Sequence, residues 1–297
     1  MKSINGDNAA DPKSSINWFP GHMRKALNQT SENLKLVDIV FETVDARIPF
    51  SSRNPELNDI IGLKPHIILL NKADLADPDK TNEWVQHYRK QGIKAIPIQA
   101  NRKGGIDNLK KSAEEELKDL LEKAAAKGRT GRPIRAMVVG VPNTGKSTLI
   151  NALSGKKSAV TGDRPGVTRA PKWIKTDSRF DLMDMPGVLW PKIKNKRSGI
   201  CLVATGAVKE EVIDVTEAAY ETMKILNELY PDLMSERYKV ELPAQDDYDC
   251  FLEMARKRGC LMSGGRIDEE RFSRLLLDDV QAGRVGRITL EVPVLKD

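Results

Sequence analysis

The sequence predicts an α/β protein with a mostly parallel sheet covered by helices, followed by a smaller helical domain. Short apolar runs alternate with helical patterns along the first two thirds of the chain, which is typical of parallel strands joined by helices. Beyond residue 204 the strand patterns fade and helical spacing dominates. The 297 residues are also enough for two domains of ordinary size.

The elements follow in order from these patterns. Residues 1–15 are polar without periodicity and are interpreted as a flexible tail. Three-and-four spacing of apolar residues makes 106–126 the clearest helix. We therefore divide the chain into the tail, an α/β domain at 16–203 and a helical domain at 204–297. The expected strands are 37–44, 67–70, 95–98, 136–139 and a short one at 287–292; further helices are expected at 212–230, 246–258 and 268–282.

Composition narrows the classes of function. Hydrophobic residues at 40% and charged residues at 30% describe a soluble globular chain. No apolar run approaches the ~20 residues of a membrane helix, and the first 15 residues lack a signal-peptide core, so we expect a cytoplasmic protein without membrane contact. Residues 1–204 carry 35 Lys and Arg against 22 Asp and Glu, whereas the remainder carries 13 against 20. The basic part favours nucleic acid or the ribosome as partner, although surplus lysine also serves solubility.

A glycine-rich loop follows the fourth expected strand. Residues 140–147 read Gly-Val-Pro-Asn-Thr-Gly-Lys-Ser and match GxxxxGK[ST] between a strand and a helix, the setting that this phosphate-binding motif requires. Backbone N–H groups at such a helix start point at phosphate oxygens. We expect Lys146 to bind the β- and γ-phosphates and Ser147 to ligate Mg²⁺. The nucleotide-binding residues predicted in this phosphate loop are Asn143, Thr144, Gly145, Lys146, Ser147 and Thr148.

A second motif expected near the nucleotide phosphates, Asp184-Met-Pro-Gly187, follows another apolar stretch. We expect Asp184 to bind Mg²⁺ through a water molecule. Gly187 can offer its N–H to the γ-phosphate because no side chain blocks the approach. Thr168 is a candidate second Mg²⁺ ligand on a loop that orders around the γ-phosphate. A glycine turn that happens to contain a threonine is the alternative for Thr168.

A base-recognition box, Asn71-Lys-Ala-Asp74, directly follows the second apolar run. An ionised Asp74 accepts two hydrogen bonds, and guanine presents two donors, its ring N–H and its exocyclic amine, whereas adenine presents a mismatched edge. The stem of Lys72 can lie on the base while its charge stays in water. Asn71 is expected to tie the loop to its neighbours. Beside a phosphate loop, this box predicts GTP as the nucleotide.

The order of the boxes is unusual. The base box precedes the phosphate loop by about 70 residues, whereas ordinary small GTPases place it after the Asp-x-x-Gly box. Joining the usual ends and cutting between the third and fourth strands gives the observed order, and such surface breaks preserve a sheet. The sequence therefore predicts a circularly permuted P-loop GTPase domain. Gln99 and Ala100 then fall where a backbone N–H usually contacts the guanine oxygen.

Seven segments in order along the chain form a recognisable set of motifs. They are Trp18-Phe-Pro-Gly-His-Met23, Asp45-Ala-Arg-Ile-Pro49, Ser51-Ser-Arg-Asn-Pro55, Asn71-Lys-Ala-Asp74, Gly162-Asp-Arg-Pro-Gly166, Leu189-Trp-Pro191 and Arg258-Gly-Cys-Leu-Met-Ser-Gly-Gly265. These segments resemble the RbgA (YlqF) group of bacterial ribosome-assembly GTPases. The resemblance runs from about residue 16 to the C-terminus and leaves out the tail. The chain departs from the pattern at Met185, where these proteins usually carry Thr, and at Gln99-Ala100, which replaces a pair that usually contains Ser or Asn.

This resemblance implies GTP hydrolysis coupled to late maturation of the large ribosomal subunit and stimulated by the ribosomal particle. The implied partners are the large subunit or its precursor and ribosomal RNA, which the helical domain contacts, and we expect a monomer. The basic clusters 192–197 and 256–258 are the candidate RNA contacts, although each could equally be a solvated face.

Two further roles come from related GTPases. The residue after Gly187 is Val188, where many GTPases place the glutamine that orients the attacking water, and a valine cannot form that hydrogen bond. The resemblance implies that His22 takes this catalytic role, and histidine titrates near physiological pH; a structural histidine is the alternative. Asn143 is a candidate ligand of K⁺, which would supply charge in place of an arginine finger. Its alternative role is to stabilise the loop.

Two rival functions remain open at this point. One is an RNA-binding factor switched by the nucleotide, for which hydrolysis is incidental. Single-turnover hydrolysis separates the two functions, because only a GTP hydrolase timed by the ribosome requires strong stimulation by large-subunit precursors. The other is an ATPase in RNA or metabolite handling, which fails if Asp74 confers guanine preference.

Overall fold

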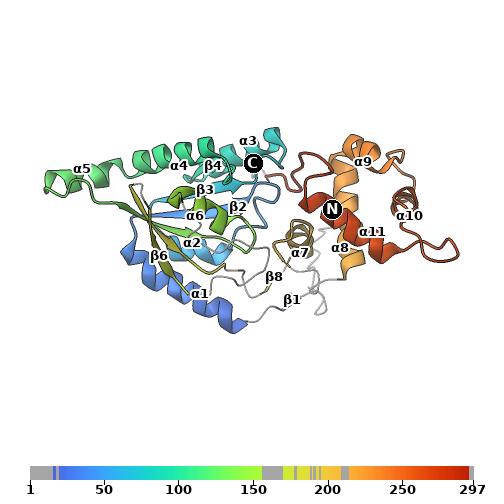
Figure 1. Cartoon of the computed structure of the whole chain (residues 1–297), viewed down its shortest axis with the longest axis horizontal. Helices are drawn as coiled ribbons and strands as arrows, with labels where there is room; N and C mark the ends of the chain where they lie inside the picture. The colour runs from blue at the N-terminus through green and yellow to red at the C-terminus, as the bar shows by residue number, and fades with distance from the viewer. Residues whose placement is uncertain are drawn as a thin grey trace, which may run out of the picture.

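The computed structural model describes residues 16–17, 20–155, 170–176, 179–187, 189, 192–193, 195–208 and 214–293. An α/β part and a helical part lie next to each other along the long axis of the molecule (Figure 1). The expected tail, Thr168 and Val188 fall outside the described residues, and only the backbone of His22 is described. Among the described residues, no helix is both long and apolar enough to span a membrane.

A six-stranded sheet forms the centre of the α/β part. Its spatial order is β4-β3-β2-β5-β7-β6, with all neighbouring pairs parallel except β6 with β7. This is the order expected of a permuted GTPase, since the phosphate-loop strand β5 lies between β7 and β2. The strands are β2 (Ile39–Asp45), β3 (His66–Asn71), β4 (Lys94–Pro97), β5 (Ile134–Val139), β6 (Lys172–Lys175) and β7 (Phe180–Asp184).

Helices cover both faces of this sheet. On one face, α4 and α6 pack against apolar side chains such as Phe41 and Leu69. On the other, α1 and α2 pack on the β2, β5 and β7 side, and α3 places Trp84 and Tyr88 over β3. The helices of this part are α1 (Pro20–Asn33), α2 (Pro55–Ile61), α3 (Pro78–Lys90), α4 (Lys103–Glu116), α5 (Lys118–Ala126) and α6 (Lys146–Ser154), with a 3-10 turn at Leu34–Leu36.

The helical part has its own apolar core, built on the edge-to-face pairs Phe251–Phe272 and Tyr238–Phe272. Ile48 and Val141, from loops at the end of the sheet, belong to the same cluster, so the two parts share apolar contacts. The helices are α7 (Lys196–Ala204), α8 (Val215–Leu229), α9 (Pro231–Tyr238), α10 (Asp247–Lys257) and α11 (Glu269–Gln281); β1 (Ile16–Asn17) and β8 (Lys192–Ile193) pair beside them.

Two expected elements differ from the structure. The helix at 106–126 divides into α4 and α5 at Leu117, a buried residue whose side chain anchors the break in the sheet-covering core. The expected strand at 287–292 is absent from the described chain; the extended backbone there bonds to loops rather than to a sheet. The predicted domain boundary at 203 falls within α7, whose buried residues pack with α8–α11.

Candidate nucleotide site

The phosphate loop connects β5 to α6 with a backbone that requires glycine at two positions. Gly140 has φ 146°, and a Cβ there would lie 2.4 Å from the carbonyl oxygen of Thr43. Gly145 has φ 94° and immediately precedes α6, so the N–H groups of the first helical turn remain available to an anion. The loop therefore has the shape that the sequence motif predicts.

Lys146 is the first residue of α6 and is buried within the loop. Its ammonium donates a 2.8 Å hydrogen bond to the carbonyl oxygen of Val141. Burial lowers the pKa of Lys146 to about 8, and the negative charge of Asp184 opposes this shift. A Cβ at Gly187 would lie 3.0 Å from the Lys146 ammonium. Lys146, Asp184 and Gly187 thus converge at one end of the sheet, as the two motifs on the phosphate side require.

The donor set at this end of the sheet fits Mg²⁺. Ser147 occupies the first turn of α6, and Asp184 ends β7 in register with Val138 of β5. The Asp184 side chain is buried, with 5% of its surface exposed. Hydroxyl and carboxylate oxygens are the hard ligands that Mg²⁺ prefers. The third expected ligand, Thr168, lies outside the described residues.

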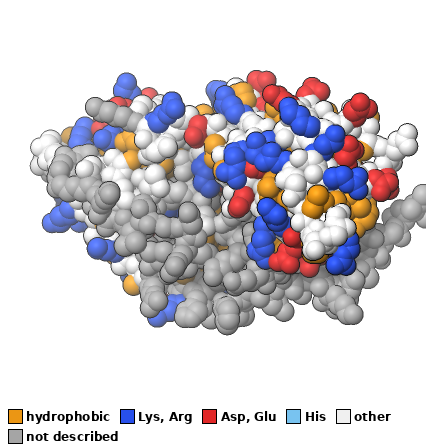
Figure 2. Space-filling view, turned by 45° about the vertical axis from the view of Figure 1, so that its right-hand side comes forward, with side chains coloured by type: hydrophobic (Ala, Val, Ile, Leu, Met, Phe, Trp, Pro, Cys, Tyr) orange, Lys and Arg blue, Asp and Glu red, His pale blue; other side chains and the backbone are white. Residues whose placement is uncertain are grey.

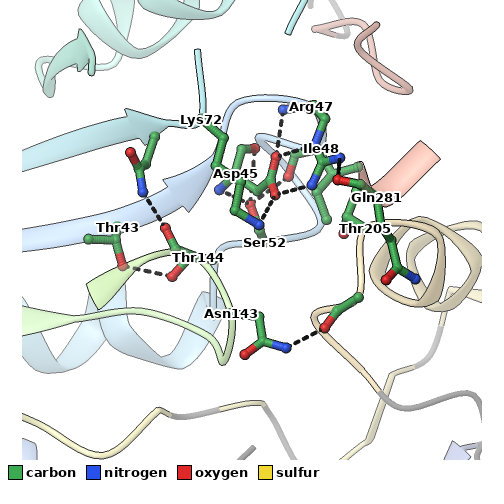
Figure 3. Close-up of polar contacts among 12 residues, drawn as sticks. Thr43, Asp45, Arg47, Ile48, Ser52, Lys72, Asn143, Thr144, Thr205 and Gln281 are labelled. Carbon is green, nitrogen blue, oxygen red and sulfur yellow. Dashed lines mark hydrogen bonds and ion pairs between the residues drawn. The ribbon is translucent and has the colours of Figure 1, made fainter. Parts of the chain in front are cut away.

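Asn71 joins the base box to the phosphate loop. Its side-chain amide donates to the Thr144 carbonyl oxygen at 2.8 Å, and its oxygen accepts from the backbone N–H of Ala100 at 3.0 Å. A Cβ at Gly145 would lie 2.1 Å from the Asn71 amide nitrogen, so only glycine permits this approach. A 2.7 Å hydrogen bond between the Thr43 and Thr144 hydroxyls adds a contact from β2 (Figure 3).

Of the other residues predicted to bind the base, Asp74 is accessible, whereas Lys72 and Ala100 are bonded within the protein. Asp74 is exposed, as a carboxylate that reads a base should be. Lys72 has φ 59° and its ammonium lies 3.0 Å from the Asp45 carboxylate, so its charge is paired within the protein. In the segment expected to offer a backbone N–H to the guanine oxygen, the N–H of Ala100 is bonded to Asn71, and the side-chain oxygen of Gln99 is buried without a hydrogen bond.

Asp45 and Arg47 form a link to the helical part that sequence patterns did not assign to the site. Arg47 is 1% exposed and donates to both carboxylate oxygens of Asp45, at 2.9 and 2.8 Å. Burial alone would raise the pKa of the Asp45 carboxyl, but the charges of Arg47 and Lys72 lower it well below its usual value. Arg47 also donates to the carbonyl oxygens of Val280 and Gln281, at the end of α11, where the last carbonyls of a helix lack partners within the helix (Figure 3).

Asn143 forms a second link between the phosphate loop and the helical part. It has φ 59°, and its amide donates a 2.6 Å hydrogen bond to the carbonyl oxygen of Gly206 in the turn after α7 (Figure 3). Gly206 in turn packs against Gln281, because a Cβ there would lie 3.0 Å from the Gln281 side-chain oxygen. The contact matches the loop-stabilising role that the sequence left open for Asn143.

Comparison with known proteins agrees with this geometry. Residues 135–234 match the family described as 50S ribosome-binding GTPase. This match begins in β5 and leaves out the base box, as the permuted order requires. A ribosome biogenesis GTPase A from Priestia megaterium is 45% identical over 279 residues, which cover 94% of this chain and 97% of the relative. The protein of that name from Thermotoga maritima is 34% identical over 281 residues, 94% of this chain and 95% of the relative.

Solved structures give the same result. A GDP-bound YlqF structure is 30% identical with a TM-score of 0.64 and covers 89% of this chain and 99% of its own. The GNP-bound YlqF from T. maritima is also 30% identical, with a TM-score of 0.62, over 91% and 99%. GTPases of this kind act on GTP and typically use Mg²⁺. The chain is a circularly permuted GTPase and belongs to the ribosome biogenesis GTPase A family.

Proposed function

We propose that this GTPase hydrolyses GTP in late assembly of the large ribosomal subunit, binds ribosomal RNA and is stimulated by the ribosomal particle. The observation that carries the proposal is that identity to ribosome biogenesis GTPases extends over 94% of the chain, through both the GTPase part and the helical part. The proposal includes action in the cytoplasm and as a monomer.

In this proposal the phosphate-side residues share the work of binding and neutralising the triphosphate. Lys146 exchanges its bond to the Val141 carbonyl for the β- and γ-phosphates, and the Gly187 N–H contacts the γ-phosphate. Ser147 ligates Mg²⁺ directly and Asp184 through water, with Thr168 as the further candidate. Bound Mg²⁺ neutralises charge that develops on the phosphate oxygens.

Base recognition in this proposal centres on Asp74, which accepts from the ring N–H and amine of guanine. Asn71 holds the base loop on the phosphate loop through the Thr144 carbonyl. Lys72 covers the base with its stem, which is compatible with its ammonium remaining on Asp45. Gln99 and Ala100 border the guanine oxygen from the loop after β4.

The proposal also includes a monovalent cation at the phosphate loop. K⁺ beside Asn143 would add positive charge near the leaving phosphate. The structural role of Asn143 rests on the 2.6 Å hydrogen bond from its side-chain amide to the Gly206 carbonyl oxygen. A cation would bind the amide oxygen of Asn143, whereas the Gly206 contact uses the amide nitrogen.

For the RNA contact, the proposal centres on the cluster 256–258. Arg256 and Lys257 are exposed at the end of α10. In the other cluster, the Lys196 ammonium lies 2.6 Å from the Glu217 carboxylate, so its charge is paired. Lys and Arg side chains lie among acidic ones over the helical part (Figure 2). Because residues 205–297 carry a net negative charge, we propose that the helical part contacts RNA through local basic clusters and not through its whole surface.

Association with purified large-subunit particles tests the proposal. We expect tighter binding with a non-hydrolysable GTP analogue than with GDP, and about a tenfold loss between 50 and 200 mM salt for every two phosphate contacts, through counterion release. The double variant Arg256→Ala, Lys257→Ala should bind more weakly with a smaller salt dependence. The matched pair Lys118→Ala, Lys123→Ala removes equal charge from α5 and should bind normally. Equal sedimentation with both nucleotides would contradict a GTP-gated association.

A further inference from the structure

The segment at 287–290 contacts the backbone of the loop that carries Asp74. The Arg287 guanidinium donates to the carbonyl oxygen of Ala76 at 2.9 Å and to that of Ala73 at 3.2 Å. Between these two contacts, the backbone N–H of Ile288 donates to the Leu75 carbonyl oxygen at 3.0 Å. The carbonyls on either side of Asp74 are therefore all bonded to a segment more than 200 positions away in sequence.

The same segment also contacts the loop after β2. Leu290 donates its N–H to the Arg47 carbonyl oxygen at 2.8 Å, and the Thr289 hydroxyl donates to the Ala46 carbonyl oxygen at 3.3 Å. Ala46 itself donates its N–H to the Asn71 carbonyl oxygen at 2.8 Å. Both Thr289 and Leu290 are fully buried. Residues 287–290 thus bridge two loops at the carboxyl ends of adjacent strands.

The residue after α11 and Tyr230 between α8 and α9 add further contacts to the base loop and to the segment 287–290. Gly283 follows α11 with φ 70°, and a Cβ there would lie 2.7 Å from a methyl carbon of Leu75. Tyr230 of the helical part donates to the Asp77 carboxylate at 3.1 Å and accepts from the Thr289 N–H at 2.9 Å. The base loop is accordingly held by the helical part along its length, from residue 73 to residue 77.

We infer that residues 287–290 are a specificity-determining part of the guanine site, with Arg287 as the positioning residue for Asp74. The inference rests on the proposed role of Asp74. An exposed carboxylate can present both oxygens to guanine only if its backbone is fixed to within a fraction of an ångström. The two hydrogen bonds of the Arg287 side chain hold the backbone on both sides of Asp74, although Arg287 lies in the segment after α11. By linkage, a partner that displaces this segment changes guanine affinity, and guanine binding changes affinity for that partner equally.

The test is selectivity between GDP and IDP, measured by competition with a fluorescent nucleotide on the full-length protein. Inosine lacks the exocyclic amine, one of the two donors that Asp74 accepts from. We expect Arg287→Ala to weaken GDP about tenfold, in line with loss of hydrogen bonds from a charged donor. IDP should weaken less, so that the GDP-to-IDP preference falls about threefold or more. Arg287→Lys, which keeps the charge but loses the planar fork, should restore part of the preference.

The control variants separate this inference from the base assignment. Arg266→Ala, which removes an exposed arginine before α11, should leave both affinities unchanged. Asp74→Asn should abolish the GDP preference and favour xanthine nucleotides, because the amide presents a donor to a guanine donor. If Asp74→Asn acts and Arg287→Ala leaves the preference unchanged, even with a lower melting temperature, Arg287 is merely structural and the inference is wrong. If Asp74→Asn has no effect, the base assignment fails and the inference fails with it.

Discussion

Replacing Lys146 with Ala is expected to lower kcat/KM for GTP hydrolysis by about 10²- to 10³-fold, the scale for losing a charged group that stabilises a transition state. The ammonium is buried, close to Asp184 and 3.0 Å from the position of a Cβ on Gly187. Triphosphate affinity should fall more than diphosphate affinity, because the lost charge faces the β- and γ-phosphates. Steady-state hydrolysis and equilibrium binding of both nucleotides measure these effects.

A matched control for this variant is Lys64→Ala. The Lys64 ammonium also donates to a backbone carbonyl, that of Val37 at 3.0 Å, but it lies on the loop before β3. The substitution Lys64→Ala should therefore leave the rate of GTP hydrolysis unchanged. Normal turnover in Lys146→Ala would show that the loop at 140–147 does not bind the triphosphate as proposed.

Replacing His22 with Ala is expected to lower particle-stimulated turnover by about 10²-fold or more while leaving GTP affinity nearly unchanged. Val188 cannot orient a water molecule, and the His22 backbone lies in the first turn of α1, beside the short strand that pairs with β8. A segment at the start of a helix can close over the nucleotide when a partner docks. Stopped-flow binding together with multiple-turnover hydrolysis on purified large subunits measures both quantities.

The outcome for His22 distinguishes three roles. If affinity falls together with turnover, His22 is a folding or docking residue. If neither changes, the water is oriented by a backbone group, a cation or the ribosome. Only loss of turnover with intact affinity supports the catalytic assignment, and His22→Gln, which restores a hydrogen-bonding side chain, should then recover part of the rate.

The strands of the sheet could be predicted because those buried on both faces appear as continuous apolar runs. Strands β2 to β5 match the expected runs to within a few residues. Strand β6 was missed, since three of its four residues are exposed and only Ile174 is buried. As an edge strand, it lacks the apolar continuity of its neighbours.

The local shape of the site was also predictable, because glycine spacing and strand ends fix it. Asn71 was expected to tie the loops together, and its contacts to Thr144 and Ala100 do so. The partners of Lys72 and Asn143 were not predictable. Their side chains bind Asp45 and the Gly206 carbonyl, which lie elsewhere in the sequence.

The hydrogen bonds by which Arg47 and Arg287 join the two parts of the protein could not be predicted from the sequence. Across the boundary between the two parts, Arg47 and Arg287 donate to backbone carbonyls, and any residue can supply a carbonyl. These carbonyls lie more than 200 positions away in the sequence. Only the folded chain shows that the end of α11 and the segment after it complete the base loop.

Single-turnover GTP hydrolysis, with and without purified precursors of the large ribosomal subunit, tests the central claim most directly. The account predicts that the precursors raise the hydrolysis rate by at least about tenfold, since the catalytic arrangement is completed on the particle. Small subunits, added at the same concentration of RNA phosphate, should not do so. An unchanged rate with bound precursors would contradict the account and would leave a nucleotide-switched RNA-binding factor whose hydrolysis is incidental.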